Sequence, residues 1–138
     1  MATFTVDVVS AERTLYSAEA TGLFVTTTTG SLGILPGHQP ILAGLDFAEM
    51  HLDLEDGTRQ HIAVHRGYVY YSGGETAVIL ADTAELAHEI DVVHERKQLV
   101  QLEEMQTKGV ETHLELPAML RMTKARIQTA EKAAAHKG

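Results

Sequence analysis

Residues 50–65 read MHLDLEDGTRQHIAVH. On both sides of Asp56-Gly57, apolar side chains alternate with polar ones, which is the spacing of half-buried β-strands. An Asp-Gly pair between two such runs is the strongest short-range signal for a tight hairpin turn, because glycine readily adopts a positive φ. The stretch therefore predicts two antiparallel strands joined at Asp56-Gly57.

The same alternation continues in both directions from this hairpin. Strands are expected near residues 4–8 and 23–28, and a second hairpin joins residues 68–71 to 76–81 around Ser72-Gly73-Gly74. No pattern of helical length separates these segments. We therefore expect an antiparallel β-sandwich or barrel of about eight to ten short strands.

The composition changes near residue 89. Residues 1–88 contain 11 acids, 3 bases and all seven aromatic residues, whereas residues 89–138 contain eight acids, eight bases and no aromatic residue. In the second part the apolar residues recur at helical spacing. We predict two domains, a β-sandwich at 1–88 and a mobile helical hairpin at 89–138.

Local signals mark the ends of the two expected helices. Asp91 is suited to cap a helix over residues 90–107, and Gly109 can adopt the left-handed conformation that ends it. Pro117 suits the first turn of a second helix that we expect to reach His136. One apolar stripe follows this second helix and is made of Leu116, Met119, Leu120, Thr123, Ile127, Ala130 and Ala134.

Composition and charge exclude several classes of protein. The 138 residues carry a formal charge of −8, which argues against nucleic acid as a partner, because phosphate binding needs bases. The absence of cysteine excludes a disulfide scaffold, a thiolate zinc site and a cysteine nucleophile. The longest apolar run, Ala77–Ala81, is far shorter than the roughly 20 residues of a membrane span, so we expect no direct membrane insertion.

Motifs for catalysis or metal binding are also missing. The chain has no Gly-x-Ser-x-Gly and no Gly-Lys-Ser/Thr, and Gly30, Gly33 and Gly37 lack the spacing of a dinucleotide-binding loop. His61 and His65 would lie about 13 Å apart along a strand, which favours solvated histidines over a metal site. Since no nucleophile lies beside a base, we expect neither an enzyme nor a bound cofactor or metal.

Two features allow more than one interpretation. Residues 30–40 combine three glycines and two prolines with Leu32, Ile34 and Leu35, which fits either a rigid loop or a preformed contact surface. From Arg121 onward five bases accompany one acid, which fits a solvated helix end. It equally fits a helix directed at an acidic partner, including the acidic sandwich of this chain.

Several stretches together resemble the epsilon subunit of bacterial F-type ATP synthases. The resemblance is carried by Gly-Ile-Leu-Pro-Gly-His at 33–38, by Leu-Ala-Asp-Thr-Ala-Glu at 80–85 and by the two-helix tail. It implies a non-catalytic rotor subunit that binds the gamma subunit and rests on the ring of c-subunits, at the cytoplasmic face of the cell membrane. In the family the helical hairpin folds against the sandwich or extends along gamma into the alpha/beta head, where it blocks ATP hydrolysis.

The resemblance also implies roles for particular residues. Those of the loop that contacts the c-ring are Ser31, Leu32, Ile34, Leu35 and His38, although position 31 is often acidic in the family. Those that would contact the beta subunits in the inhibitory state are Arg121, Lys124 and Arg126.

Some members of the family bind ATP through an Ile/Leu-Asp-x-x-Arg-Ala motif. Here Ile90 and Asp91 match it, but His94 replaces the arginine and Glu95 the alanine, which argues against ATP binding. The alternative to a stalk subunit is an autonomous nucleotide-sensing β-sandwich with a helical latch. Titration with ATP separates the two interpretations.

Overall fold

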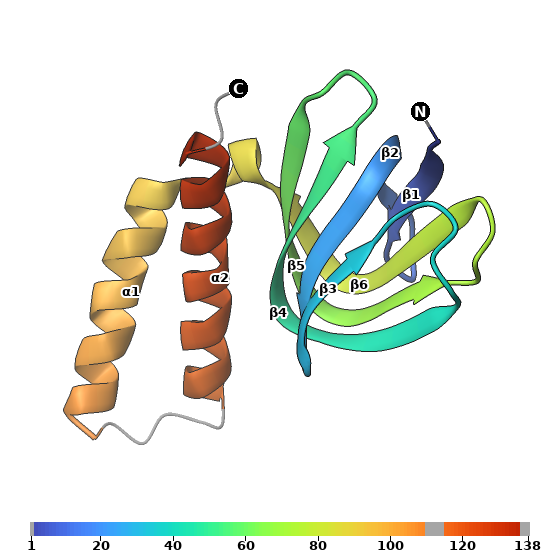
Figure 1. Ribbon diagram of the computed structural model, residues 1–138. Coiled ribbons are helices and arrows are strands. Elements are labelled where there is room, and N and C mark those ends of the chain that lie inside the picture. Colours follow the sequence, from blue (N-terminus) through green and yellow to red (C-terminus); the bar gives the residue numbers. More distant parts are fainter. Residues whose placement is uncertain (1, 110–114, 136–138) are drawn as a thin grey trace.

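The computed structural model describes residues 2–109 and 115–135, which form a β-sandwich with two helices beside it (Figure 1). This architecture confirms the predicted fold class. The strands are β1 (Phe4–Val9), β2 (Thr14–Thr27), β3 (Gly30–Ile34), β4 (Ile41–Leu54), β5 (Arg59–Tyr71) and β6 (Thr76–Leu86). A short 3-10 turn (Ala87–Glu89) leads to helices α1 (Val92–Thr107) and α2 (Glu115–Ala135).

Five of the strands close into a ring, in the order β1-β6-β5-β4-β2 and back to β1. Strand β1 completes the ring because it pairs with β2 on one side, Phe4 opposite Ala20, and with β6 on the other, Val6 opposite Ala77. The β1–β6 pair is parallel and every other pair is antiparallel. Strand β3 adds to β2 outside the ring.

The described residues form six strands, four of them 11 to 14 residues long, where the sequence predicted eight to ten short ones. Two segments that look separate in sequence, near residues 62–65 and 68–71, belong to the single strand β5. The strand bends between them at Arg66, with φ of 56°, and at Gly67. A Cβ atom at Gly67 would lie 1.7 Å from the carbonyl oxygen of Leu80, so only glycine lets β5 and β6 approach this closely.

The stretch at residues 30–40 is held rigidly. Its first five residues are strand β3, and the Leu35-Pro36-Gly37-His38 turn is closed by a 3.0 Å hydrogen bond from the His38 amide to the Leu35 carbonyl. The buried hydroxyl of Tyr71 accepts from the Gly37 amide at 3.1 Å and donates to the Gly74 carbonyl at 2.7 Å. One side chain therefore ties this turn to the neighbouring hairpin.

The predicted helix ends are confirmed where the structure describes them. The Asp91 carboxylate accepts from the His94 amide at 3.1 Å, Gly109 has a φ of 64°, and Pro117 lies in the first turn of α2. The predicted end of the second helix, His136, lies outside the described residues. No helix in the described part of the chain is long and apolar enough to cross a membrane.

Helix α2 lies between α1 and the sandwich (Figure 1). It packs on α1 through Leu116 and Leu120, which meet Leu102. The single predicted stripe is partly wrong, because Met119 and Ala134 are exposed while Ala125 and Thr129 are buried. A helix covered on two sides buries a wider arc than one apolar stripe.

Candidate functional site at the helix–sandwich interface

The two clusters of buried apolar residues do not merge across the interface between helices and sandwich. One cluster lies inside the sandwich and the other between α1 and α2. On α2, the side chains that contact the sandwich include the bases at 121, 126 and 132, and the buried residues between them at 125 and 129 are the small Ala and Thr. The hairpin is therefore held against the sandwich mainly by polar contacts.

Three bases of α2 pair with acids of the sandwich. Arg121 donates from Nε to Asp46 Oδ2 at 2.8 Å, and Lys132 pairs with Glu49 on the same strand, β4. The third base, Arg126, pairs with Glu85 on β6. Of the two interpretations left open for the basic helix, the described structure has the one in which it meets the acidic sandwich of its own chain.

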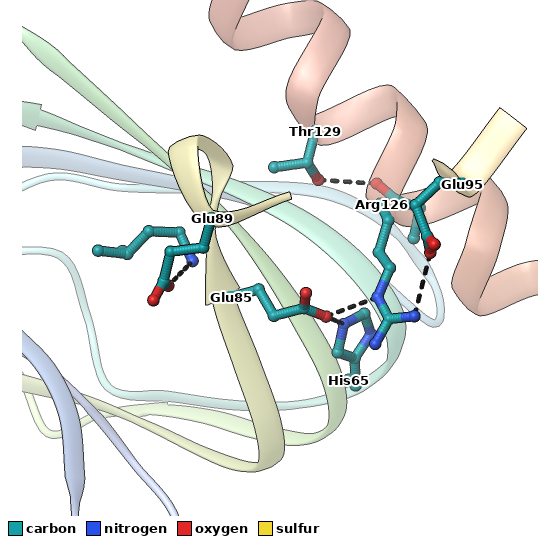
Figure 2. A network of polar contacts seen from close by, with 8 residues as sticks. His65, Glu85, Glu89, Glu95, Arg126 and Thr129 are labelled. Carbon is teal, nitrogen blue, oxygen red and sulfur yellow. Dashed lines mark hydrogen bonds and ion pairs between the residues drawn. The ribbon is translucent and has the colours of Figure 1, made fainter. Parts of the chain in front are cut away.

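Arg126 is the centre of this interface, and Figure 2 shows its contacts. Its Nε donates to Glu85 Oε1 at 2.6 Å, and its Nη1 donates to Glu95 Oε1 of α1 at 3.1 Å. His65 Nε2 donates to the same Glu85 oxygen at 2.9 Å. One connected network therefore joins β5, β6, α1 and α2.

Charge and burial shift the protonation of this network. The hydrogen bond from His65, and the bond and charge of Arg126, hold the pKa of Glu85 below its ordinary value despite partial burial. Burial alone would lower the pKa of Arg126, but its bonds to Glu85 and Glu95 raise it above the ordinary value. Both groups are therefore charged at neutral pH when the hairpin is docked.

A second contact between α2 and the sandwich lies about one and a half turns from Arg126, where Arg121 meets Asp46 and Phe47 of β4. The guanidinium of Arg121 lies 5.5 Å from the centre of the Phe47 ring, and that of Arg66 lies 4.9 Å from it. Arg66 also approaches Asp46, with 3.8 Å between its Nε and Oδ1. Two arginines, one from α2 and one from β5, share an acid and a ring.

The prediction that His61 and His65 are solvated is wrong. Their exposed fractions are 6% and 2%, because α2 covers the outer face of β5 as the sandwich core covers its inner face. His61 continues a row of rings with His51 and Phe24, at centroid separations of 5.4 and 4.9 Å. Among residues 2–109 and 115–135, no three or more His, Asp or Glu side chains are grouped to hold a metal ion.

The residues predicted for c-ring contact do not share one environment. Ser31 and Leu35 are exposed, and Leu32 and His38 are half-buried. Ile34 has no exposed surface, because it belongs to the sandwich core. It offers nothing to a partner in this conformation, so that assignment is corrected to a core role.

The predicted beta-subunit contacts differ in the same way. Arg121 and Arg126 are engaged with the sandwich, whereas Lys124 is exposed and forms no ion pair with a described residue. At the start of α1, the Asp91 carboxylate is used as the helix cap and His94 is exposed, while Ile90 is half-buried.

Sequence reasoning missed an exposed apolar patch on the outer face of the sandwich. Leu42 lies opposite Tyr70 across β4 and β5, and Tyr68 lies opposite Leu80 across β5 and β6. Their exposed fractions run from 46% to 66%. The apolar run Ala77–Ala81 could have revealed the patch, because a strand that alternates inward and outward must expose part of such a run.

Comparison with known proteins gives a consistent result. A family model described as ATP synthase, Delta/Epsilon chain, beta-sandwich domain matches residues 3–87. The ATP synthase epsilon chain of Streptomyces coelicolor is 36% identical over 120 residues, covering 87% of this chain and 93% of that one. That of Psychrobacter cryohalolentis is 37% identical, covering 96% of both chains.

Solved structures share the fold. A chain of the Euglena gracilis mitochondrial ATP synthase superposes with a TM-score of 0.76 at 18% identity, covering 99% of this chain and 83% of that one. A chain from the central stalk and c-ring of the Tetrahymena thermophila enzyme gives 0.54 at 13% identity, covering 94% and 95%.

Proposed function

Since the chain belongs to the ATP synthase delta/epsilon family, we propose that it is a central-stalk subunit of a proton-translocating ATP synthase, whose helical hairpin restrains ATP hydrolysis. It is an accessory subunit without catalytic activity of its own. The observation that carries the proposal is the polar docking of α2. Arg121 and Arg126, which hold the hairpin against the sandwich, are also the bases that would bind an acidic partner in the undocked state.

The sandwich offers two separate surfaces, which we assign to two different partners. We assign the apolar patch of Leu42, Tyr68, Tyr70 and Leu80 to the gamma subunit, because an exposed patch of this kind is typical of a protein interface. The rigid turn that includes Leu35 and His38, with Ser31 and Leu32 beside it, is assigned to the c-ring. Through these partners the chain would lie at the cytoplasmic face of the membrane.

The hairpin supplies the regulatory contact. When it is docked, Arg121 and Arg126 are occupied by Asp46, Glu85 and Glu95. Undocking exposes these charges, which are then free to meet acidic loops of the beta subunits in the catalytic head. Docked and undocked hairpins are thus two states of one element, and partners shift the balance between them.

Two kinds of variant distinguish the docking of the hairpin on the sandwich from its inhibition of ATP hydrolysis. Asp46→Asn with Glu85→Gln weakens docking but leaves every helix charge in place, so ATP hydrolysis by the assembled enzyme should fall. Arg121→Ala with Lys124→Ala and Arg126→Ala removes the charges that brake, so hydrolysis should rise although the hairpin is released. Asp53→Asn is the matched control, because Asp53 pairs with Arg59 beside the β4–β5 turn and not with α2.

The assay is ATP hydrolysis by the reconstituted head with each variant, after capture of the chain by gamma and c-ring subunits. Opposite effects of the sandwich and helix variants support the proposal. Capture with hydrolysis unchanged in both would refute the brake and retain the stalk role. Failure of the wild-type chain to bind either partner would refute the stalk assignment itself.

A further inference from the structure

Arg66 has an unusual backbone conformation. It is the one non-glycine residue with a positive φ, 56°, among residues 2–109 and 115–135, and it lies inside a strand. Residues with a Cβ atom are strained in this left-handed region, and such strain is often retained where a side chain must point in a particular direction.

The Arg66 side chain shares two groups, Asp46 and Phe47, with Arg121 of α2. Arg121 holds Asp46 with a 2.8 Å hydrogen bond, and Arg66 stands 3.8 Å from the other oxygen of that carboxylate. Arg66 also lies closer than Arg121 to the Phe47 ring, at 4.9 against 5.5 Å. Arg66 thus already forms a long ion pair with Asp46, while the shorter hydrogen bond to this carboxylate is made by Arg121.

We propose that Arg66 is the substitute partner of Asp46: it already lies over Phe47 and within ion-pair range of Asp46, and it closes onto that carboxylate with a hydrogen bond when α2 undocks. The proposal rests on the proposed release of the hairpin. Without Arg66, undocking would leave Asp46 without a cation and Phe47 uncovered. With Arg66 both groups keep a cation from the sandwich itself, and in the docked state the charge of Arg66 also opposes that of Arg121. Arg66 therefore shifts the hairpin toward release.

The first test measures undocking by hydrogen exchange of the α2 amides. Arg66→Asn retains a residue that tolerates positive φ, and it should slow exchange of α2 about two- to five-fold, the range that one exposed ion pair produces. Arg59→Asn is the control, because it removes an arginine of the same strand that pairs with Asp53 away from α2. Equal or faster α2 exchange in Arg66→Asn would overturn the proposal.

The second test does not depend on spontaneous release. In Arg121→Ala the NMR signal of the Arg66 Nε–H should shift and become protected from exchange, and addition of Asp46→Asn should abolish this change. An Arg66 signal that is the same in wild type and Arg121→Ala overturns the substitute role. If instead the Arg66 signal responds but the α2 amides of the wild type are as protected from exchange as those of the core strands, the proposed release of the hairpin is refuted, whereas the role of Arg66 as a substitute partner of Asp46 is retained.

Discussion

Replacement of Arg126 by alanine should release the hairpin without unfolding the sandwich. The guanidinium makes one hydrogen bond to Glu85 and one to Glu95, and it is the group through which α2 reaches both β6 and α1. The side chains of Arg126, Glu85 and Glu95 have exposed fractions of 27%, 28% and 9%. Its removal leaves a nearly buried carboxylate on α1 without its cation.

The magnitude follows from the bond to Glu85, because the bond to Glu95 lies within the hairpin and is retained when the hairpin leaves the sandwich. A hydrogen bond to a charged group contributes about 1.5–3 kcal/mol when it is fully buried. Because Glu85 retains its bond to His65 and water reaches more than a quarter of the Arg126 and Glu85 side chains, we expect about 1–2 kcal/mol. At about 1.4 kcal/mol for each tenfold change, the ratio of docked to undocked hairpin should fall roughly 5- to 30-fold.

Hydrogen exchange of the α2 amides measures this ratio, with the amides of the closed strand ring as an internal reference. Lys124→Ala is the matched control, because Lys124 belongs to the same helix, is exposed and pairs with no described residue. Exchange in α2 should accelerate in Arg126→Ala and remain unchanged in Lys124→Ala. An acceleration below about three-fold, or an equal effect of both variants, would refute the role given to the Arg126 network.

Four further outcomes are expected. The bonds from His65 and Arg126 keep the pKa of Glu85 below the ordinary 4.5, so the contribution of Glu85 to docking should be complete above that pH and lost as the pH falls through the lower pKa of the docked state. Limited proteolysis of the hairpin between pH 7 and pH 3 tests this. Proteolysis that is equal at every pH would contradict it. Gly67→Ala should lower the free energy of unfolding by about 3 kcal/mol or more, or prevent folding, because its Cβ would overlap the Leu80 carbonyl; thermal denaturation followed by circular dichroism measures the loss. Removal of residues 90–138 should leave a folded sandwich that still binds gamma, since the strand ring is complete at Leu86, and a chain that fails to fold would show that the ring depends on the hairpin. Calorimetric titration with ATP should detect no binding tighter than about millimolar, which corresponds to about −4 kcal/mol; tighter binding would favour the nucleotide-sensing alternative.

Local signals in the sequence predicted local structure well. The Asp56-Gly57 turn, the cap at Asp91 and the positive φ of Gly109 are each determined by a few neighbouring residues, and all are present. The two-part architecture followed from the change of period from strands to helices. These features required no knowledge of which elements meet in space.

What the sequence did not predict depends on contacts between distant elements. His61 and His65 occupy polar positions of an alternating strand, and only the docking of α2 buries them. The Arg126 network joins residues as far apart as 65 and 126, which no spacing rule connects. Ile34 was assigned to a contact surface through the resemblance to the family, whereas the strand alternation of β3 turns it inward.

The closed strand ring also constrains the order in which the chain can fold. Its first strand pairs in parallel with its last, with Thr5 opposite Thr76 and Val9 opposite Leu80. Such a pairing joins distant segments and forms slowly, because the intervening loop must close first. During synthesis, β1 gains its second neighbour only after Leu80 has left the ribosome. We therefore expect closure of the sandwich to be a late step in folding, in which the strands between residues 4 and 86 become stable together.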